Sequence, residues 1–142
     1  MGINPTESDV KELLFSSLGD SRGELIALEQ FKEIPFEIKR IYYIFQTAEN
    51  VKRGFHAHQS LKQVAIALSG SCVFDVETES GSSSHLLDSP SKGLYMGGLV
   101  WREMRDFSHD CVLLVIASEC YDEADYIRSY DAFKHQKSLL AQ

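Results

Sequence analysis

Short stretches rich in β-forming residues, separated by turn residues, recur through most of this chain. Residues 62–68 and 71–77 flank a Ser-Gly dipeptide, which is the sequence signature of a β-hairpin. Residues 100–107 and 111–117 form a second pair of predicted strands, also joined by a polar turn. Short strands at this spacing are typical of an all-β sandwich or barrel. We therefore expect an all-β fold.

Further segments extend this pattern towards both ends of the chain. The alternation of apolar and polar residues over 24–29 predicts a strand, whereas the polar run 79–84 predicts a loop. Short strands are expected at 85–87 and 93–96. Residues 122–134 differ, because their aromatic and aliphatic side chains recur at helical spacing. The tail is therefore predicted to form a short C-terminal helix that caps the barrel.

The segment 36–46 is the strongest early strand and has aromatic residues on both faces. Successive side chains of a strand point to opposite faces, so Tyr42 lies on one face and Tyr43 and Phe45 lie on the other. A strand of this kind suits the inside of a barrel or a subunit interface. Together with the apolar residues near the N-terminus, it predicts a homodimer in which one chain completes the sheet of the other.

Composition limits the classes of protein that this chain can belong to. Its 142 residues, 44% of them hydrophobic, fit a single domain spanning residues 1–142. A net charge of -7 argues against a nucleic-acid partner. No apolar run is long enough to cross a membrane, and the first twenty residues lack the features of a signal peptide. We expect a cytoplasmic protein without a membrane partner, whose three cysteines are reduced.

The run from Arg53 to His58 is the strongest candidate for a functional site. In an extended strand His56 and His58 point the same way, with Ala57 turned behind them. Gly54 allows close approach of another backbone, and neutral imidazoles donate or accept protons near neutral pH. The alternative is a pair of histidines on a solvated strand face.

The histidine pair also resembles part of a known motif. Together with Gln63 and Gly70 it matches the spacing of the first cupin motif, in which glutamate stands at the position of Gln63. Residues 93–102 resemble the second cupin motif, with Arg102 in place of its final histidine. The resemblance implies a double-stranded β-helix, or jelly-roll barrel, with the site in the barrel mouth. Because a guanidinium opposes a cation, we expect a site with no metal and no cofactor.

Over most of its length the chain resembles one branch of the cupins, the dTDP-4-keto-6-deoxyhexose 3,4-ketoisomerases. The matching segments are Gly19 to Gly23, Ile41 to Ile44, Arg53 to His58, Leu94-Tyr95, Trp101 to Met104 and Ala117 to Tyr130. Histidine usually follows the tryptophan in this family, so Arg102 is a departure, and Gly98 stands where proline is usual. The resemblance implies a homodimer that acts on a dTDP-linked 4-keto-6-deoxyhexose, in the biosynthesis of 3-amino-3,6-dideoxyhexoses.

The chemistry of such enzymes suits these residues. Moving a ketone from C4 to C3 requires removal of the C3 proton, an enediol and return of a proton to C4. A base that titrates near the working pH points to His56 or His58 as the proton carrier. We favour His58 as the carbon base, because His56 lies nearer to Arg53, whose charge would lower the pKa of His56. Arg53 and Tyr43 are the candidate donors to the enediolate oxygens.

Four further residues are candidates for substrate binding. Arg22 and Arg102 have the geometry to clamp a diphosphate. Tyr95 and Trp101 have aromatic rings that stack on a nucleobase, with plain core packing as the alternative.

Three other functions compete with ketoisomerisation. A non-catalytic sugar-binding cupin needs the same barrel and no proton carrier. A metal-dependent cupin oxygenase needs Gln63 as a ligand. A nucleotide-sugar epimerase uses the same proton abstraction beside a ketone, and only the family resemblance separates it from a ketoisomerase. The C4 configuration of the product and the strictness for dTDP stay open.

Overall fold

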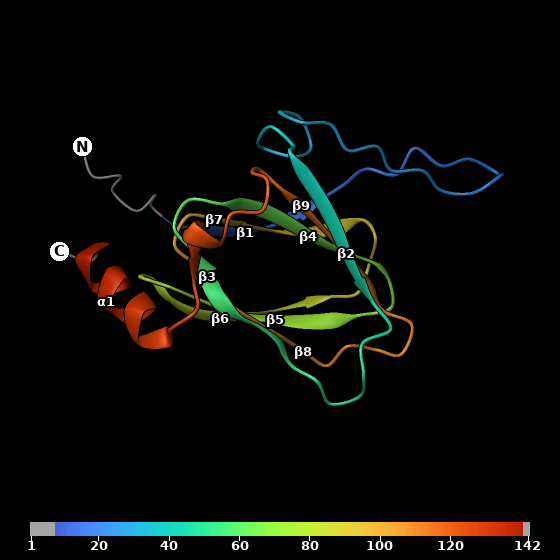
Figure 1. Cartoon of the computed structure of the whole chain (residues 1–142). Helices are drawn as coiled ribbons and strands as arrows, with labels where there is room; N and C mark the ends of the chain where they lie inside the picture. The colour runs from blue at the N-terminus through green and yellow to red at the C-terminus, as the bar shows by residue number, and fades with distance from the viewer. Residues whose placement is uncertain (1–7, 141–142) are drawn as a thin grey trace.

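Two antiparallel sheets of five strands each face one another in the computed structural model, which describes residues 8–140 (Figure 1). The elements are β1 (Asp9–Leu14), β2 (Arg40–Phe45), β3 (Arg53–His58), β4 (Lys62–Ser69), β5 (Cys72–Thr78), β6 (Gly81–Leu87), β7 (Lys92–Gly97), β8 (Trp101–Arg105), β9 (Val112–Ala117), a 3-10 turn η1 (Glu123–Asp125), β10 (Tyr126–Ile127) and α1 (Tyr130–Leu140). The sheet orders are β1-β7-β4-β9-β2 and β10-β3-β8-β5-β6. This arrangement is a cupin-like jelly roll, so the predicted fold class is confirmed. The ends of the predicted domain, residues 1–7 and 141–142, lie outside the described residues.

The two predicted hairpins are wrong in their pairing. β4 and β5 belong to different sheets, as do β8 and β9, because the chain crosses from one sheet to the other at each of these turns. The first turn depends on Gly70, whose φ is 65° and where an added Cβ would lie 2.2 Å from the Ser108 Oγ atom. A Ser-Gly turn signals a reversal of the chain, but it does not decide whether the next strand pairs in the same sheet or starts the opposite one.

Buried apolar side chains form two large layers and a third, smaller cluster under α1. The layer between the sheets consists of Ala65, Ala67, Cys72, Phe74, Val76, Leu87, Leu94, Met96, Val100, Met104, Cys111, Leu113 and Val115. A second layer lies on the outer face of the sheet that contains β4 and β9. It consists of Phe15, Ile34, Phe36, Val64, Ile66, Tyr95 and Ile116. Residues 15–38 therefore cover the outside of this sheet, which is why its strands are apolar on both faces.

The predicted strand at 24–29 and the predicted loop at 79–84 both differ from the structure in their backbone hydrogen bonding. Residues 24–29 are extended, and their alternation places Ile26 and Leu28 against the outer layer, but they form no strand ladder. The polar run 79–84 is a turn only at residues 79–80, and from Gly81 onwards it pairs with β5 as an edge strand. Because its exposed positions are mostly serines, this strand lacks the alternation of apolar and polar residues by which strands are predicted.

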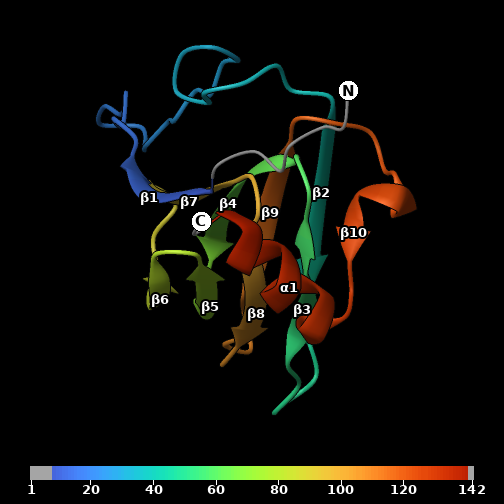
Figure 2. The same cartoon turned by 90° about the vertical axis from the view of Figure 1, so that its left-hand side faces the viewer.

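The predicted C-terminal helix begins later than expected. Residues 123–125 form η1, and Tyr126 and Ile127 then pair with β3, so α1 starts only at Tyr130. Figure 2 shows α1 in front of β3. Among the described residues, the structure has no helix that is both long enough and apolar enough to cross a membrane.

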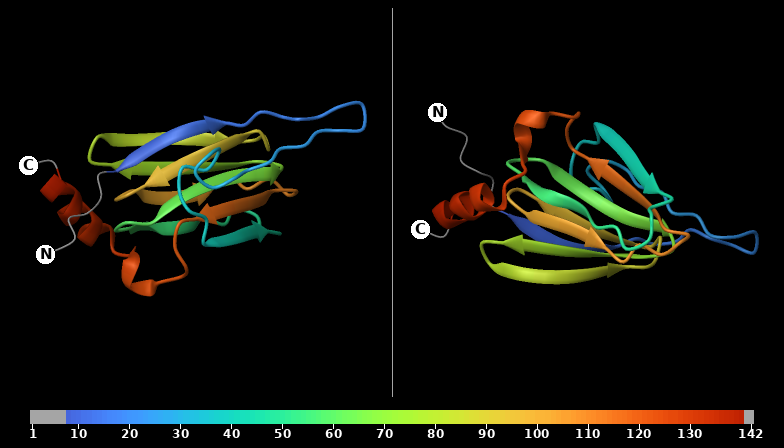
Figure 3. Two further views of the ribbon diagram at one scale, coloured as in Figure 1. Left: turned by 90° about the horizontal axis from the view of Figure 1, so that it is seen from above. Right: turned by 60° about the horizontal axis from the view of Figure 1, so that its bottom comes forward.

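The segment 15–35 forms an arm that begins and ends on the outer layer and protrudes beyond the sheets in between, at the end opposite α1 (Figure 3). Large apolar side chains on this arm are exposed to solvent, among them Leu18 at 66% and Phe31 at 74%. The outer side of the edge strand β2 is similarly exposed at Ile41 and Phe45. The described part of one chain therefore leaves apolar surface uncovered on both the arm and β2.

Candidate active site

The two histidines of β3 point into the space between the sheets. Their ring centroids are 5.0 Å apart and the ring planes are nearly perpendicular, so the prediction that they share a face is confirmed. Gly54 brings β3 close to β8: its φ is 90°, and an added Cβ would lie 2.9 Å from the Arg102 carbonyl oxygen. A register shift follows between Gly54 and His56, which then lies opposite Arg102.

Arg102 is buried beside the histidines at 2% exposure. Its Nη1 atom donates to the Gln63 side-chain oxygen at 2.5 Å and its Nη2 atom donates to the Val100 carbonyl at 2.9 Å. The Gln63 amide nitrogen in turn donates to the Tyr42 hydroxyl at 3.2 Å. The Arg102 Nε atom is buried without a hydrogen-bond partner among the described residues. One fixed positive charge therefore stands at the centre of the site.

This donor set does not fit a divalent cation. The imidazoles of His56 and His58 and the neutral amide of Gln63 could act as ligands, but the Arg102 guanidinium beside them repels a cation. Within residues 8–140 there is also no group of three histidine, cysteine or carboxylate side chains placed to hold a metal. Metal independence of the reaction stays a prediction.

Burial and the charge of Arg102 keep both imidazoles neutral. Burial is the larger effect and Arg102 the next, and together they lower the pKa of His56 to about 4 and that of His58 to about 2. The prediction that Arg53 lowers the pKa of His56 below that of His58 is therefore wrong. The charge that lowers both pKa values is that of Arg102, and the pKa of His58 is the lower of the two. Both rings begin any reaction as proton acceptors.

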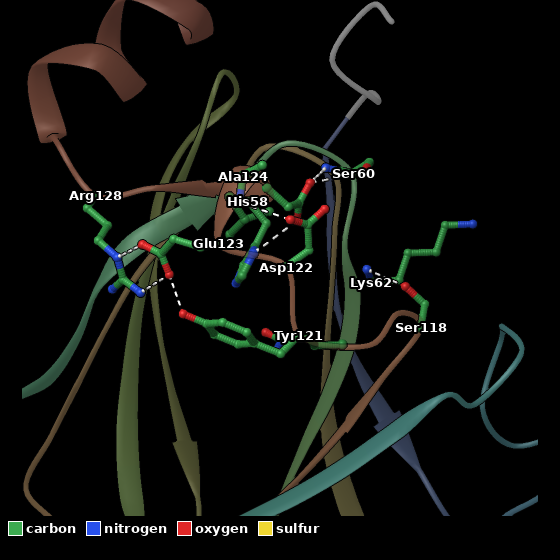
Figure 4. Close-up of polar contacts among 12 residues, drawn as sticks. His58, Ser60, Lys62, Ser118, Tyr121, Asp122, Glu123, Ala124 and Arg128 are labelled. Carbon is green, nitrogen blue, oxygen red and sulfur yellow. Dashed lines mark hydrogen bonds and ion pairs between the residues drawn. The ribbon is translucent and has the colours of Figure 1, made fainter.

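His58 has a carboxylate partner on the loop that precedes β10. Its Nδ1 atom lies 3.1 Å from Asp125 Oδ2, while Asp125 Oδ1 accepts from the backbone nitrogen and the hydroxyl of Ser60. The Tyr126 ring packs against both imidazoles, at centroid distances of 5.1 Å from His56 and 4.3 Å from His58. Figure 4 shows His58 among the polar contacts of this loop.

The same loop borders a cavity of about 400 Å³ that reaches His58. The Glu123 carboxylate accepts from both the Arg128 guanidinium and the Tyr121 hydroxyl (Figure 4), and these contacts, Arg128 first, lower the pKa of Glu123 to about 2. Arg40 lines the cavity from β2, with its guanidinium 5.7 Å from the Tyr121 ring centroid. The cavity therefore opens between β2 and β10, the edge strands of the two sheets.

Two of the residues predicted to be catalytic lie outside this site. Tyr43 is 62% exposed and packs against Phe45 on the outer face of β2, so Tyr42 is the tyrosine that faces the barrel. Arg53 is exposed at the first position of β3.

The predicted substrate-binding residues are also separated by the fold. Tyr95 packs on Phe36 in the outer layer, with ring centroids 6.4 Å apart. Trp101 lies on the outer face of β8, under Phe133 of α1, and donates to Glu103. Both rings are therefore core, as the alternative interpretation held. The Arg22 side chain is 89% exposed on the arm, where it pairs with Asp20. Arg102 alone of the four stands beside the histidines.

Several site residues have no signal that composition or periodicity could reveal. In the sequence Arg40 is one of several clustered basic residues, and the alternation of its strand allows either Tyr42 or Tyr43, but not both, to enter the barrel. Asp125 and Tyr126 fall in the segment 117–130 that carries the family resemblance, but nothing in the sequence shows that this segment folds back beside β3. That pairing is what brings Asp125 to His58.

Two neutral imidazoles, a buried guanidinium and a tyrosine inside a jelly roll define a cupin whose site suits acid–base chemistry. The family model described as "FdtA: WxcM-like, C-terminal" matches residues 8–138, and this chain belongs to that family.

Characterised relatives are similar over nearly the whole chain. The TDP-4-oxo-6-deoxy-alpha-D-glucose-3,4-oxoisomerase of Aneurinibacillus thermoaerophilus is 53% identical over 124 residues, which are 87% of this chain and 89% of that protein. A 3,4-ketoisomerase from Helicobacter canadensis is 49% identical with a TM-score of 0.88, covering 92% of this chain and 98% of its own. QdtA, a sugar 3,4-ketoisomerase from Thermoanaerobacterium thermosaccharolyticum solved with TDP, is 42% identical with a TM-score of 0.90 over the full length of both chains.

Proposed function

We propose that this protein is an isomerase that moves the keto group of a dTDP-linked 4-keto-6-deoxyhexose from C4 to C3. The observation that carries the proposal is the pair of neutral imidazoles beside the buried Arg102 guanidinium. The names of the relatives support the same reaction, and a histidine-to-asparagine mutant of the Thermoanaerobacterium enzyme was solved with TDP-4-keto-6-deoxyglucose. The family assignment favours ketoisomerisation over epimerisation and over simple sugar binding.

The reaction begins with transfer of the C3 proton to an imidazole. We assign this step to His58, because its Nε2 atom is buried without a partner among residues 8–140 and is free to accept. The electron pair of the C3–H bond forms the C3–C4 double bond, and the negative charge moves to O4. Arg102 and the Tyr42 hydroxyl, which burial keeps protonated by raising its pKa, are the donors to that oxygen.

The second half of the reaction reverses these movements on the neighbouring carbon. His56 carries the O3 proton to O4, and the electron pair left on O3 forms the new C3 carbonyl. The double-bond electrons then take the proton from His58 at C4. Every proton and electron pair is accounted for without a redox step, so the residues of this site suffice for the reaction.

The nucleotide part of the substrate fits the cavity between β2 and β10. Arg40 lines this cavity, and its guanidinium forms no ion pair within the described chain, so it is available for a diphosphate. We assign the diphosphate to Arg40 in place of Arg22 of the same chain, because Arg22 is on the protruding arm.

The exposed apolar surface supports a homodimer. A second copy that covers the arm and the outer face of β2 would remove Leu18, Phe31 and Phe45 from water. In such a dimer the exposed Arg22 side chain would be free to act on the substrate of the partner, which would keep its predicted role. We place the enzyme in the cytoplasm, where it serves the biosynthesis of 3-amino-3,6-dideoxyhexoses.

The deciding experiment is NMR of dTDP-4-keto-6-deoxyglucose incubated with the protein in D2O. Ketoisomerisation predicts a 3-keto product, with deuterium at C4 of the product and at C3 of the remaining substrate wherever the protonated His58 exchanges with solvent before it returns its proton. An epimerase would exchange hydrogen beside the ketone without moving the carbonyl, and a binding protein would leave both positions unlabelled. Either result would contradict the proposal. The exposed His109, changed to Gln, provides a matched control with full activity.

A further inference from the structure

The contact between His58 and Asp125 has the geometry of an oriented imidazole. His58 is 1% exposed, its Nδ1 atom is 3.1 Å from Asp125 Oδ2, and its Nε2 atom is buried without a partner in the described chain. An ionised carboxylate can only accept a hydrogen bond. The Nδ1 atom therefore carries the proton, and the lone pair stands on Nε2.

The Asp125 carboxylate is itself held from several directions. Its second oxygen, Oδ1, accepts from the Ser60 backbone nitrogen at 3.1 Å and from the Ser60 hydroxyl at 3.2 Å. The Asp125 carbonyl accepts from Gln59 at 3.0 Å, and the Asp125 nitrogen donates to Asp122 at 3.1 Å. The neighbouring residue Tyr126 pairs with His58 in the β10–β3 ladder. Only Oδ2 is left to face the imidazole.

His56 has no such partner, since no carboxylate of residues 8–140 forms a hydrogen bond or ion pair with its ring. The other charged groups near the pair are Arg102, Arg40, Arg128 and Glu123: the three arginines disfavour a protonated His58, and Glu123 favours a protonated His56 without a hydrogen bond to its ring. Asp125 is thus the one carboxylate in contact with either ring of the pair, and it touches His58.

We propose that Asp125 is a positioning residue that fixes the His58 tautomer, with the proton on Nδ1 and the accepting lone pair on Nε2. This inference deepens the proposed function and rests on it for the role of His58. When His58 takes the C3 proton, Asp125 also offsets part of the charge that forms on the ring. Asp125 itself takes no part in the transfer of the proton, as in other carboxylate-oriented histidines.

The substitution Asp125→Asn tests this role, because the Ser60 backbone N–H fixes the orientation of the new amide. That N–H needs an acceptor, so the amide oxygen takes the place of Oδ1 and the NH₂ group faces His58 Nδ1. A donor at this position drives the ring proton to Nε2. Expected results are a kcat lowered about 100-fold with KM within about 3-fold, and C3 deuterium exchange slowed in parallel.

The matched control is Asp110→Asn, which changes an aspartate that also accepts from a serine hydroxyl, on an exposed turn. We expect full activity from it. Nitrogen-15 NMR of labelled histidine reads the tautomer directly, and the wild-type protein should show protonated Nδ1 on His58 while Asp125→Asn shows protonated Nε2. The wild-type spectrum needs neither turnover nor a folded variant.

The outcomes separate the two proposals. A wild-type His58 protonated on Nε2, or an Asp125→Asn protein with unchanged tautomer and unchanged kcat, would overturn the role of Asp125. A wild-type protein that shows the predicted tautomer but never moves the ketone would leave the role of Asp125 in orienting the ring supported and would refute the isomerase.

Discussion

Lowering the pH from 7.5 to 5.0 should destabilise this protein through its two buried histidines. An unfolded histidine has a pKa of about 6.5, whereas the folded values are about 4 for His56 and about 2 for His58. Between these values the unfolded chain binds protons that the folded chain does not. The stability is therefore complete above about pH 6.5 and is lost as the pH falls towards the folded pKa values.

The size of the effect follows from the same values. Each pH unit below 6.5 costs about 1.4 kcal/mol for each histidine that stays neutral in the folded state. At pH 5.0 both still do, so the loss is about 2 kcal/mol per histidine and about 4 kcal/mol in total. Carboxylates with a lowered pKa, such as Asp75 and Glu77, lose their contribution only at lower pH.

Urea unfolding at pH 7.5 and pH 5.0 measures this difference. His58→Gln and His56→Gln should each lose about 2 kcal/mol less than the wild type between the two pH values, whatever their stability at pH 7.5. The exposed control His109→Gln should behave as the wild type. If the three variants and the wild type lost equal stability, the pKa values of His56 and His58 would not be lowered by folding, and the neutral imidazoles assigned to the site would be wrong.

Three further predictions follow from the geometry. Treatment with EDTA should leave isomerase activity intact, with well below one metal ion per chain by elemental analysis; activity lost and then restored by one metal would refute this. Tyr42→Phe should lower kcat about 10-fold or more while Tyr43→Phe changes it less than about 2-fold, because only the Tyr42 hydroxyl faces the barrel. Trp101→Phe should cost about 1–3 kcal/mol in urea unfolding with KM unchanged, and a large rise in KM would return Trp101 to the binding site.

The class of fold could be predicted from the sequence because strand and turn signals are local. Which strands pair could not, because a jelly roll repeatedly sends consecutive strands to opposite sheets, and Gly70 marks only the reversal. For the same reason the face of a lone strand stays ambiguous. Tyr42 and Tyr43 alternate correctly, but only the packing of β2 against β9 shows which one lies inside.

Contacts within the site could be predicted between residues that are close in sequence, but not between residues that are far apart in sequence. The spacing of His56 and His58 sets their common face, and the cupin spacing led to Arg102. Trp101 was misplaced because its neighbour Arg102 points inward, so that Trp101 must point outward on the same strand. The contact of Asp125 with His58 could not be predicted, because the two residues are 67 positions apart and only the pairing of β10 with β3 brings them together.

In the proposed mechanism, Arg102 links the two electrostatic requirements of the reaction. After burial, its positive charge is the next largest cause that lowers the pKa of both histidines, and a low pKa makes an imidazole a weak base. When negative charge forms on the enediolate oxygen, it offsets the positive charge of Arg102. Arg102 then lowers the pKa of the histidines less than before. The pKa of the imidazole that receives the proton then rises as the enediolate forms. Proton transfer and stabilisation of the oxyanion therefore support each other, and replacement of Arg102 by Met should make the histidines easier to protonate while slowing the isomerisation.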